Sequence, residues 1–404
     1  MRAVVFTLGC KVNEVESAAI MAELEKRGWQ VSERLSPADI YVLNTCAVTK
    51  EAERKSRQLI SRVRKFSADA PIYVCGCASQ KDAKQFEKDG VRFITGAQKK
   101  EQIINAVCAD FGGEQCGELG YPKQVKTRAF IKIEDGCNNF CSYCVIPYLR
   151  GRVRSRSWQD IAGEIQNCTA PEVVLTGINI SAYNGHPDGL RGLIQKLCFV
   201  DKRVRLGSIE CNVIDEQFLL ALKALKDFAP HFHLSLQSGS KAVLRAMNRH
   251  YTREEFLDKC ALIYTHFPDA AITTDIIVGF CGESEEDFED SLSIIAQAGF
   301  YRVHAFAFSP REGTVAFSMP DLPAEVKSRR LHKLLEEANA AENAYLTKRQ
   351  GKEYSVICED FDGEYTCGYT QNYIKTYIAG EHTGKREVIL GAPYRDGVLA
   401  TLKN

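Results

Sequence analysis

Over the first 122 residues, short apolar runs alternate with stretches in which apolar residues recur every three or four positions. A strand followed by a helix, repeated several times, is typical of a parallel sheet covered by helices. We therefore predict a doubly wound parallel α/β domain over residues 1–122. The predicted strands are 4–8, 39–43, 72–74 and 92–95, and the predicted helices are 14–27, 50–65 and 82–88.

The same alternation continues over residues 123–345, with about six strand and helix units. Eight such units close a barrel, so six predict an incomplete (β/α)6 barrel that is open on one side. The predicted strands are 130–133, 173–176, 204–209, 233–236, 271–277 and 302–308.

From residue 346 to 404 the helical period disappears and short apolar and aromatic runs are separated by turn residues. This pattern predicts a small all-β barrel as a third domain. Its expected strands are 354–358, 364–369, 374–377, 386–390 and 398–402.

The chain has 404 residues, no net charge and 16 cysteines. A bulk charge of zero says nothing about partners, so contact with nucleic acid would depend on local patches. The start of the chain is too short for a signal peptide, and no apolar run reaches the roughly 18 residues that span a bilayer. We expect a cytoplasmic protein without a membrane segment. In a reducing compartment, ligation of a metal or cluster explains the cysteines better than a disulfide framework does.

Three of the cysteines, Cys137, Cys141 and Cys144, lie in one loop with the spacing C-x3-C-x2-C. Three thiolates can bind three irons of a 4Fe–4S cluster and leave the fourth iron open, whereas most cluster proteins supply four. Structural zinc is the alternative, but it takes four ligands, and no further Cys or His follows at finger spacing. The loop follows a predicted strand, so a cluster would lie at the carboxyl end of a sheet.

A second set of three cysteines, Cys10, Cys46 and Cys77, follows three predicted strands of the first domain. The carboxyl ends of parallel strands share one edge of the sheet, where doubly wound proteins bind ligands. We expect these thiols to converge as a second cluster site. The alternative is three buried cysteines without a common role, because cysteine is often buried.

Polar residues also follow the strands of the central domain, among them Thr176, Gly177, Glu210 and Gln237. In barrels of this class the chemistry gathers at the carboxyl ends of the strands, so these residues predict a pocket beside the cysteine loop. Each of them taken alone is equally well explained as turn chemistry.

Two segments suggest contact with RNA. Arg150, Arg152 and Arg154 alternate along a segment that, if extended, places their guanidinium groups on one side, where they suit phosphate. In the tail, Tyr373 and Lys375 supply an aromatic face and a cation on the predicted barrel. The alternatives are a solvated charged loop and a barrel that only packs against its neighbour.

The Cys137, Cys141 and Cys144 loop resembles the signature of the radical S-adenosylmethionine (SAM) superfamily. Its combination with the N-terminal three-cysteine domain and a C-terminal β barrel resembles the methylthiotransferases, whose tail is called a TRAM domain. The sequences at 9–13, 43–49 and 136–147 look most like the branch that modifies threonylcarbamoyladenosine in tRNA. The resemblance covers essentially the whole chain and implies that the central domain is a radical SAM barrel.

The resemblance implies two 4Fe–4S clusters and two SAM molecules. Cys137, Cys141 and Cys144 would hold the cluster that binds and cleaves SAM, and Cys10, Cys46 and Cys77 the cluster that carries sulfur. Tyr143, Thr176, Gly177, Glu210 and Gln237 would contact SAM. The product would be a methylthio group on carbon 2 of N6-threonylcarbamoyladenosine in the tRNA anticodon stem-loop. A flavodoxin-like or similar electron donor and a monomer are further expectations.

Other functions fit parts of the same pattern. A sibling enzyme would modify isopentenyladenosine in tRNA or an aspartate of a ribosomal protein. An iron–sulfur electron carrier would need neither the open barrel nor a SAM pocket. A zinc-stabilised RNA-binding protein would contain zinc in place of iron and sulfide.

Overall fold

The computed structural model describes residues 1–121 and 127–403, so the predicted boundary between residues 122 and 123 lies outside the described residues. The chain forms two compact units. The first comprises Met1–Lys123, Asp135–Asn138 and Cys144–Val153, and the second comprises Gln124–Glu134, Asn139–Tyr143 and Arg154–Asn404. A separate third domain from residue 346 onward stays a prediction.

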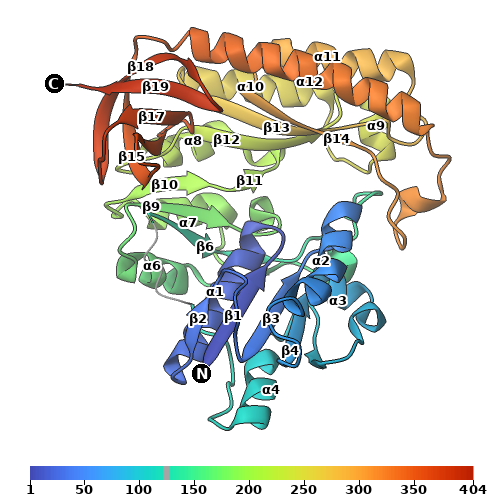
Figure 1. The fold of residues 1–404 in the computed structure, drawn as a ribbon. Helices are drawn as coiled ribbons and strands as arrows, with labels where there is room; N and C mark the ends of the chain where they lie inside the picture. The colour runs from blue at the N-terminus through green and yellow to red at the C-terminus, as the bar shows by residue number, and fades with distance from the viewer. Residues whose placement is uncertain (122–126, 404) are drawn as a thin grey trace. The chain divides into compact units, whose positions relative to one another are not determined.

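The first unit is built on a five-stranded parallel sheet with the order β2-β1-β3-β4-β5 (Figure 1). This is a doubly wound arrangement, as predicted, because the strand order reverses between β1 and β3. The elements are β1 (Arg2–Thr7), α1 (Lys11–Lys26), β2 (Gln30–Ser32), β3 (Ile40–Thr45), α2 (Lys50–Val63), β4 (Ile72–Gly76), α3 (Cys77–Lys81), the 3-10 helix η1 (Ala83–Phe86), β5 (Val91–Ile94), α4 (Glu101–Phe111) and α5 (Ile146–Arg150).

The two faces of this sheet bury alternate residues of each strand, since successive strand side chains point to opposite sides. Val5, Val42 and Tyr73 pack against α1 and α4 on one face. Val4, Leu43, Val74 and their neighbours pack against α2, α3 and residues of the α5 segment on the other. Helices cover both faces, which is why these strands read as continuous apolar runs.

The second unit begins with two parallel sheets, the three-stranded β6-β9-β10 and the four-stranded β11-β12-β13-β14. Only Gly207 separates β10 from β11 along the chain, so the predicted strand 204–209 is one strand interrupted at that residue. A side chain at residue 207 would place its Cβ 2.9 Å from the carbonyl oxygen of Leu175. The strands are β6 (Arg128–Lys132), β9 (Glu172–Thr176), β10 (Arg203–Leu206), β11 (Ser208–Ile209), β12 (His231–Gln237), β13 (Ala271–Val278) and β14 (Arg302–Ala307).

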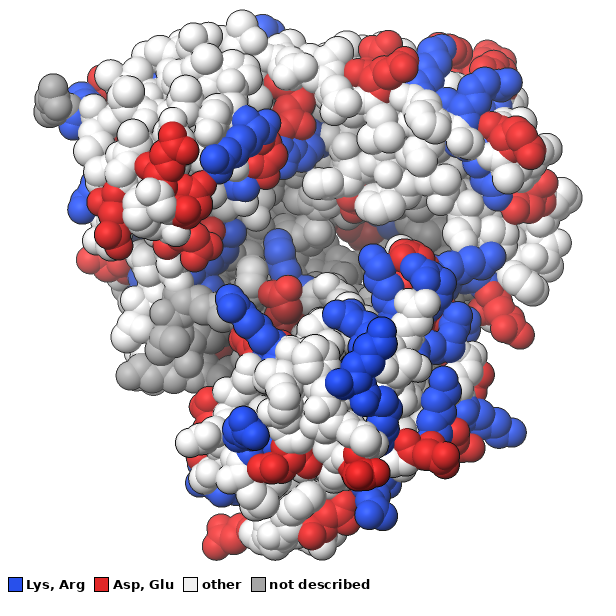
Figure 2. Space-filling view, in the orientation of Figure 1, with Lys and Arg blue, Asp and Glu red and all other residues white. Residues whose placement is uncertain are grey.

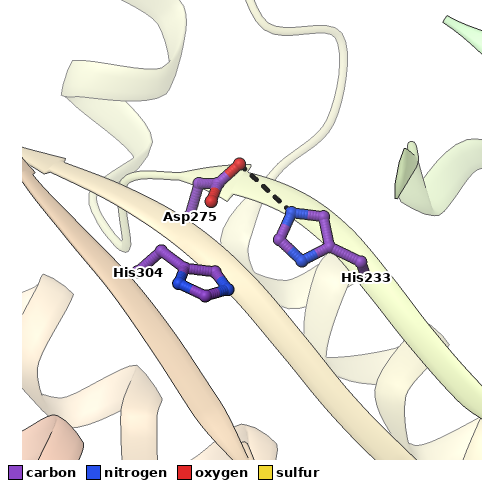
Figure 3. A group of neighbouring side chains, drawn as sticks. All are labelled: His233, Asp275 and His304. Carbon is purple, nitrogen blue, oxygen red and sulfur yellow. Dashed lines mark hydrogen bonds and ion pairs between the residues drawn. The ribbon is translucent and has the colours of Figure 1, made fainter. Parts of the chain in front are cut away.

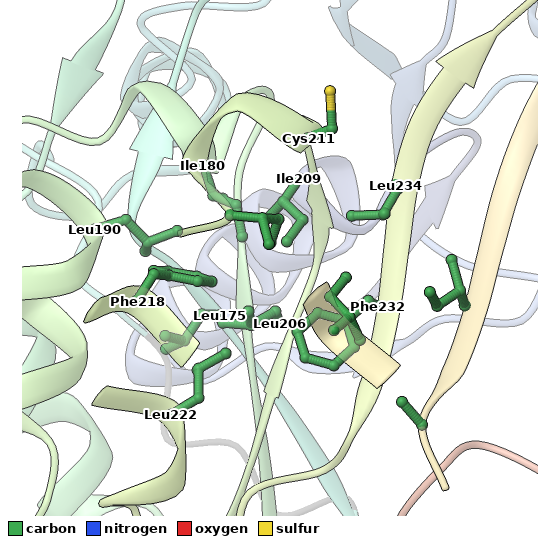
Figure 4. Packing of buried hydrophobic residues seen from close by; sticks show 14 of the residues in the cluster. Leu175, Ile180, Leu190, Leu206, Ile209, Cys211, Phe218, Leu222, Phe232 and Leu234 are labelled. Carbon is green, nitrogen blue, oxygen red and sulfur yellow. The ribbon is translucent and has the colours of Figure 1, made fainter. Parts of the chain in front are cut away.

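Helices cover the outer face of this partial barrel and enclose its core. Figure 4 shows Leu175, Leu206, Phe232 and Leu234 from the strands meeting Phe218 and Leu222 of a helix. The helices are α6 (Trp158–Asn167), α7 (Gly189–Lys196), α8 (Glu216–Lys223), α9 (Lys241–Ala246), α10 (Arg253–His266), α11 (Glu285–Ala298) and α12 (Ala324–Thr347), with 3-10 turns η2 (Ile180–Ala182), η3 (Cys211–Val213) and η4 (Val315–Ser318). The predicted incomplete (β/α)6 barrel is confirmed.

The chain ends in a closed five-stranded barrel with the order β15-β16-β17-β19-β18, which confirms the predicted all-β tail (Figure 1). Its core contains Val356, Ile378 and Val398. The strands are β15 (Glu353–Phe361), β16 (Tyr365–Thr370), β17 (Lys375–Ala379), β18 (Lys385–Tyr394) and β19 (Gly397–Leu402). Two short strands, β7 (Glu134–Asp135) and β8 (Arg154–Ser155), flank the cysteine loop in the sequence.

One predicted helix is wrong. Residues 82–88 do not form an α-helix, because the α-helical turn occurs earlier, at α3, and Asp82 instead caps the 3-10 turn η1 by accepting a hydrogen bond from the Lys84 backbone N–H at 3.1 Å. In the described part of the chain, every helix is too short or too polar to cross a membrane.

Candidate active site

Three cysteines of the first unit follow three adjacent strands. Cys10 is the N-cap residue of α1, three residues after the end of β1, Cys46 follows β3, and Cys77 is the first residue of α3 after β4. Because the strands are parallel, all three residues lie at the carboxyl edge of one sheet. Cys10 and Cys46 flank the point between β1 and β3 where the strand order reverses, which is where doubly wound sheets bind ligands.

The backbone around Cys10 and Cys46 is close-packed. Gly9 has φ +119°, and a side chain there would place its Cβ 2.9 Å from both the Cβ and the Sγ of Cys46. The Asn13 amide donates to the carbonyl oxygens of Leu8 at 2.8 Å and Thr45 at 3.2 Å, joining the ends of β1 and β3. Only glycine at residue 9 lets the two cysteine-bearing turns approach this closely.

The surroundings of Cys46 and Cys77 oppose ionisation of their thiols unless a cation is bound. Burial, with smaller contributions from the neighbouring Cys77 and Cys10, raises the pKa of Cys46 to about 11, although a backbone hydrogen bond at Val48 and the charge of Arg150 act in the opposite direction. Burial also raises the pKa of Cys77, against the effect of Arg150. Thiolates are the ligands of iron–sulfur clusters, so three mutually interacting thiols in this setting fit a cluster whose positive iron ions compensate for their charge.

Arg150 is the main positive group of this site and is itself buried, with 1% of its side chain exposed. Its guanidinium group donates to Glu16 at 3.0 Å, to Asp135 at 3.1 Å and to the Asn13 side-chain oxygen at 2.6 Å. Burial disfavours the charge, but Glu16, Cys77 and Asp135 outweigh it and hold the pKa of Arg150 well above its ordinary value. The guanidinium group therefore stays charged beside the thiols.

The Cys137, Cys141 and Cys144 loop has its own structural supports. The Cys137 backbone N–H donates to the Gly151 carbonyl oxygen at 3.1 Å. Gly136, with φ +86°, brings the chain so close to residue 152 that a Cβ would lie 2.1 Å from the Arg152 carbonyl oxygen. A glycine immediately before the first cysteine is therefore a steric requirement of the loop.

In the second unit, Cys141 is held by a cation. Arg249 Nη1 donates to Cys141 Sγ at 3.3 Å, and Nη2 lies 3.0 Å from Glu210 Oε1. Burial alone would lower the pKa of Arg249, but Tyr251, Tyr143, Cys141 and Glu210 outweigh it and raise that pKa. Asn139 of the loop also donates to Glu210, at 2.5 Å. Glu210 thus joins the loop to the end of β11 through two partners.

The other residues predicted to contact SAM lie at different strand ends. Thr176 is buried at the end of β9, and a Cβ on Gly177 would meet Glu134 Oε2 at 2.8 Å. Gln237 ends β12 with φ +75°. Tyr143 makes an edge contact with Phe280, with ring centroids 6.5 Å apart. A SAM-binding role for these residues stays a proposal.

The predicted arginine ridge is divided by the structure. Arg152 and Arg154 are exposed, whereas Arg150 ends α5 and is buried among the carboxylates of Glu16 and Asp135. Arg150 departs from the expected extended segment because α5 turns its side chain inward. We accordingly assign Arg150 a positioning role, and we keep Arg152 and Arg154 as proposed RNA contacts.

The two tail residues predicted to bind RNA have different surroundings. Tyr373 is half-buried between rings, with Tyr369 stacked at 4.8 Å and His231 at 4.7 Å. Lys375 pairs with Asp396 at 2.8 Å. Asp396 is 66% exposed, so the ion pair of Lys375 lies at the surface.

Basic side chains also gather on the first unit, over α2 (Figure 2). We call the exposed set the α2 basic face; it consists of Lys50, Arg54, Lys55, Arg62 and Lys65. Glu51 neutralises part of it through Arg54 at 2.5 Å and Lys55 at 3.6 Å. A chain with no net charge thus has a local surface suited to phosphate.

Sequence reasoning missed Arg249 and Asn248. Asn248, with φ +57°, donates to the carbonyl oxygens of Asn139 and Phe140 at 3.0 and 3.2 Å and so supports the loop. Both lie about 100 residues after the loop, and their only local signal is a polar run between two helices.

The architecture and the cysteine loop together define a radical SAM protein. The sequence pattern of the Radical SAM superfamily matches residues 131–295, and that of the Uncharacterized protein family UPF0004 matches residues 2–96. A solved radical S-adenosylmethionine methyltransferase, TsrM from Kitasatospora setae, has a similar fold, with a TM-score of 0.59 and 13% identity over 78% of this chain and 77% of that one.

Several curated relatives are similar over nearly the whole chain. Threonylcarbamoyladenosine tRNA methylthiotransferase MtaB of Chlamydia pneumoniae is 36% identical over 91% of this chain and 89% of its own length. The MtaB of Thermotoga maritima is 36% identical, with coverages of 94% and 92%. A tRNA-2-methylthio-N(6)-dimethylallyladenosine synthase of Caldicellulosiruptor saccharolyticus is 36% identical, with coverages of 88% and 80%. The chain belongs to the radical SAM methylthiotransferase family, and it is therefore a transferase.

Proposed function

We propose that this enzyme adds a methylthio group to carbon 2 of N6-threonylcarbamoyladenosine in the anticodon stem-loop of tRNA, using two 4Fe–4S clusters and two SAM molecules. The observation that carries the proposal is a similarity over nearly the whole chain to enzymes named for this substrate, together with the two three-cysteine sets of the sequence. The relatives named MtaB in Chlamydia and Thermotoga are covered over 89% and 92% of their length, and the Caldicellulosiruptor dimethylallyl enzyme over 80%.

Cys10, Cys46 and Cys77 would hold one cluster, and Cys137, Cys141 and Cys144 would hold the other. When bound, these groups supply the reductive cleavage of SAM and the sulfur that is transferred, chemistry that side chains lack. The protein positions the cysteines and places positive charges beside them. Gly9 and Gly136 permit the close backbone approaches of the cysteine turns, and Arg150 and Arg249 place a permanent positive charge beside thiols of each set.

The tRNA would be held through its phosphates. Arg152 and Arg154 are exposed and the α2 basic face adds further cations, so phosphate contacts do not require the buried Arg150. Bases of an RNA loop are already unstacked or easily splayed, which makes an anticodon-loop adenosine accessible to a pocket. An electron donor of the flavodoxin-like class and a monomeric state remain predictions.

Mass spectrometry of tRNA nucleosides tests the substrate. A strain deleted for this gene should lose 2-methylthio-threonylcarbamoyladenosine and accumulate the unmodified threonylcarbamoyl nucleoside, and the wild-type gene should restore the product. A Cys141→Ala variant should not restore it. Loss of the 2-methylthio-dimethylallyl nucleoside instead would assign the sibling specificity, and unchanged tRNA nucleosides would contradict both.

Iron and sulfide analysis tests the cofactors. Anaerobic reconstitution should give about eight irons per chain, the sum of two 4Fe–4S clusters. A triple substitution of Cys10, Cys46 and Cys77 by alanine should halve this number, and so should the matching triple substitution of the loop. Zinc without sulfide would contradict the assignment.

A further inference from the structure

A group of metal-ligand side chains lies in the second unit, on the partial barrel. His233, Asp275 and His304 come from the neighbouring strands β12, β13 and β14, and their ligand atoms all lie within 4.8 Å of one another. Figure 3 shows the three side chains directed toward the same space on one side of the sheet. A metal ion is held by at least three ligands such as His, Cys, Asp or Glu. Among the described residues, this group has the spacing that suits a single ion.

Strand register explains why these side chains meet. Asp275 and His304 are direct partners across β13 and β14, and His233 pairs with Thr273, two residues before Asp275 on β13. A spacing of two keeps side chains on one face of a strand. The opposite face carries Leu234, Ile276 and Val303, which are buried in the core under the helices. The histidines and the aspartate therefore lie on the face turned away from the helical layer.

The distances fit ligands of one ion. His233 Nε2 and Asp275 Oδ2 are 3.1 Å apart. Two ligand atoms bonded to one metal at about 2.1 Å are separated by roughly 3.0–3.4 Å in tetrahedral or octahedral geometry. His304 is exposed, so rotation of its ring can bring the third nitrogen to the same point without disturbing the core.

A second hydrogen bond orients His233 as metal-binding histidines are usually oriented. Its other ring nitrogen, Nδ1, lies 2.9 Å from Thr273 Oγ1, and that hydroxyl lies 3.0 Å from His231 Nε2. One hydroxyl can donate to one imidazole while it accepts from the other. Thr273 thus satisfies the Nδ1 side of His233 and leaves Nε2 directed at Asp275, the arrangement that supports a histidine ligand.

From this geometry we infer that His233 Nε2, Asp275 and His304 bind a divalent transition-metal ion of the zinc, ferrous or manganous class. Two imidazoles and one carboxylate suit these ions, and three protein ligands leave coordination positions on the inner side of the partial barrel for water or an oxygen ligand. The site contains none of the six cysteines proposed to hold the clusters, so its occupancy can be measured independently of them and of the proposed tRNA reaction.

Mn²⁺ is the probe that best separates this site from the cysteines, because thiolates bind it poorly. The anaerobically reconstituted protein, freed of loose metal on a chelating resin, is titrated with Mn²⁺ while the electron paramagnetic resonance signal of free Mn²⁺ is recorded. We expect saturation at one Mn²⁺ per chain. We also expect Zn²⁺ to displace Mn²⁺, because such ligands bind Zn²⁺ more tightly than Mn²⁺.

Variants identify the ligands. Asp275→Asn and His304→Ala should weaken Mn²⁺ binding at least tenfold, and Thr273→Val should weaken it about tenfold, as the loss of an outer partner does. His266→Ala is the matched control, because His266 forms a histidine–carboxylate pair with Glu216 at 2.8 Å but belongs to no three-residue group in the described chain. Iron content and circular dichroism confirm that each variant is folded.

Two results would overturn the metal site. One is the absence of saturable Mn²⁺ and Zn²⁺ binding by the wild-type protein. If in that case Asp275→Asn also lowers the affinity for tRNA, the group contacts the substrate directly instead of a metal ion. The other is binding that stays unchanged in both Asp275→Asn and His304→Ala. Neither result depends on methylthio transfer, so failure of this site and failure of the proposed function are distinguishable.

Discussion

Arg150 donates a hydrogen bond to Glu16 at 3.0 Å across 134 positions of the sequence. Glu16 lies on α1, the helix that Cys10 caps, and Arg150 lies six residues after Cys144. The ion pair therefore fixes the segment after the cysteine loop against the helix that begins at the first cysteine. Because the Arg150 side chain is 1% exposed and that of Glu16 is 11% exposed, solvent screens the pair only weakly.

Replacing Arg150 by alanine should destabilise the first unit by about 3–5 kcal/mol, since it leaves Glu16 and Asp135 without their buried cation. Retention of the cluster proposed at Cys10, Cys46 and Cys77 should fall as well. Denaturant unfolding of the holoenzyme and iron analysis measure the two effects. Arg152→Ala is the control, because Arg152 is exposed. Equal stability of the two variants would contradict a positioning role for Arg150.

Replacing Arg249 by methionine should make the cluster proposed at the loop harder to reduce. The change removes a positive charge and an N–H donor 3.3 Å from Cys141 Sγ, and hydrogen bonds to cluster sulfurs are among the factors that set the potential. A redox titration monitored spectroscopically should show a more negative midpoint for this cluster. Arg245→Met, four residues earlier and exposed, should leave the midpoint unchanged. A midpoint that does not move in Arg249→Met would show that this arginine does not tune the cluster.

The positions of the strand-end cysteines were predictable because they depend on local pattern and one rule of topology. An apolar run followed by a cysteine marks a strand and its carboxyl end, and parallel strands bring such ends to one edge. Cys10, Cys46 and Cys77 need no further information to be placed on that edge. The partial barrel and the terminal barrel were predictable for the same reason, since both follow from the alternation of short segments.

The burial of Arg150 was not predictable from its neighbours. The alternation of arginines at 150, 152 and 154 suggests an extended ridge, but α5 begins at Ile146 with Pro147 in its first turn, where proline is favoured, and ends at Arg150. What turns the side chain inward is a pair of carboxylates, one of them on α1. Long-range ion pairs of this kind leave no periodic signal in a sequence.

The His233, Asp275 and His304 group shows an intermediate case. Each residue lies in a predicted strand. Because side chains alternate between the two faces of a strand, the sequence alone places each residue on the face opposite to the buried apolar side chains of that strand. Which residues of β12, β13 and β14 are neighbours depends on the register between strands, and β12 has an irregularity between Leu234 and Gln237. Register is set by tertiary packing, so the group appears only in the structure.

Acid should weaken the second unit through Glu172, which is 1% exposed and lies 2.8 Å from Arg205 and 2.7 Å from Arg128. Burial alone would raise the pKa of Glu172, but Arg205, Arg128 and Arg203 outweigh it and hold that pKa below its ordinary value. A lowered pKa contributes stability that is present above the unfolded-state pKa and is lost as the pH falls through the folded-state pKa.

Glu172→Gln should therefore be less stable than wild type near neutral pH, by about 3–5 kcal/mol, because it leaves buried arginines unpaired. The difference should shrink as the pH falls below the unfolded-state pKa of a Glu, about 4.3, and through the lower folded-state pKa of Glu172, where wild type loses the same interaction. Urea unfolding at several pH values measures it. Glu312→Gln, at an exposed position, should differ little from wild type at any pH. A difference that stays constant with pH would exclude Glu172 as the titrating group.

Charge reversal at Arg152 and Arg154 should weaken tRNA binding through the phosphates. Both side chains are exposed, and each phosphate contact that is lost should reduce the slope of log affinity against log salt by roughly 0.7–0.9. Fluorescence anisotropy with a labelled anticodon stem-loop, repeated over a range of salt concentrations, measures affinity and slope together. Lys348→Glu supplies the control, because Lys348 is an exposed cation at the end of α12. Reversal of both arginines that leaves the slope at its wild-type value would show that this segment does not touch the RNA backbone.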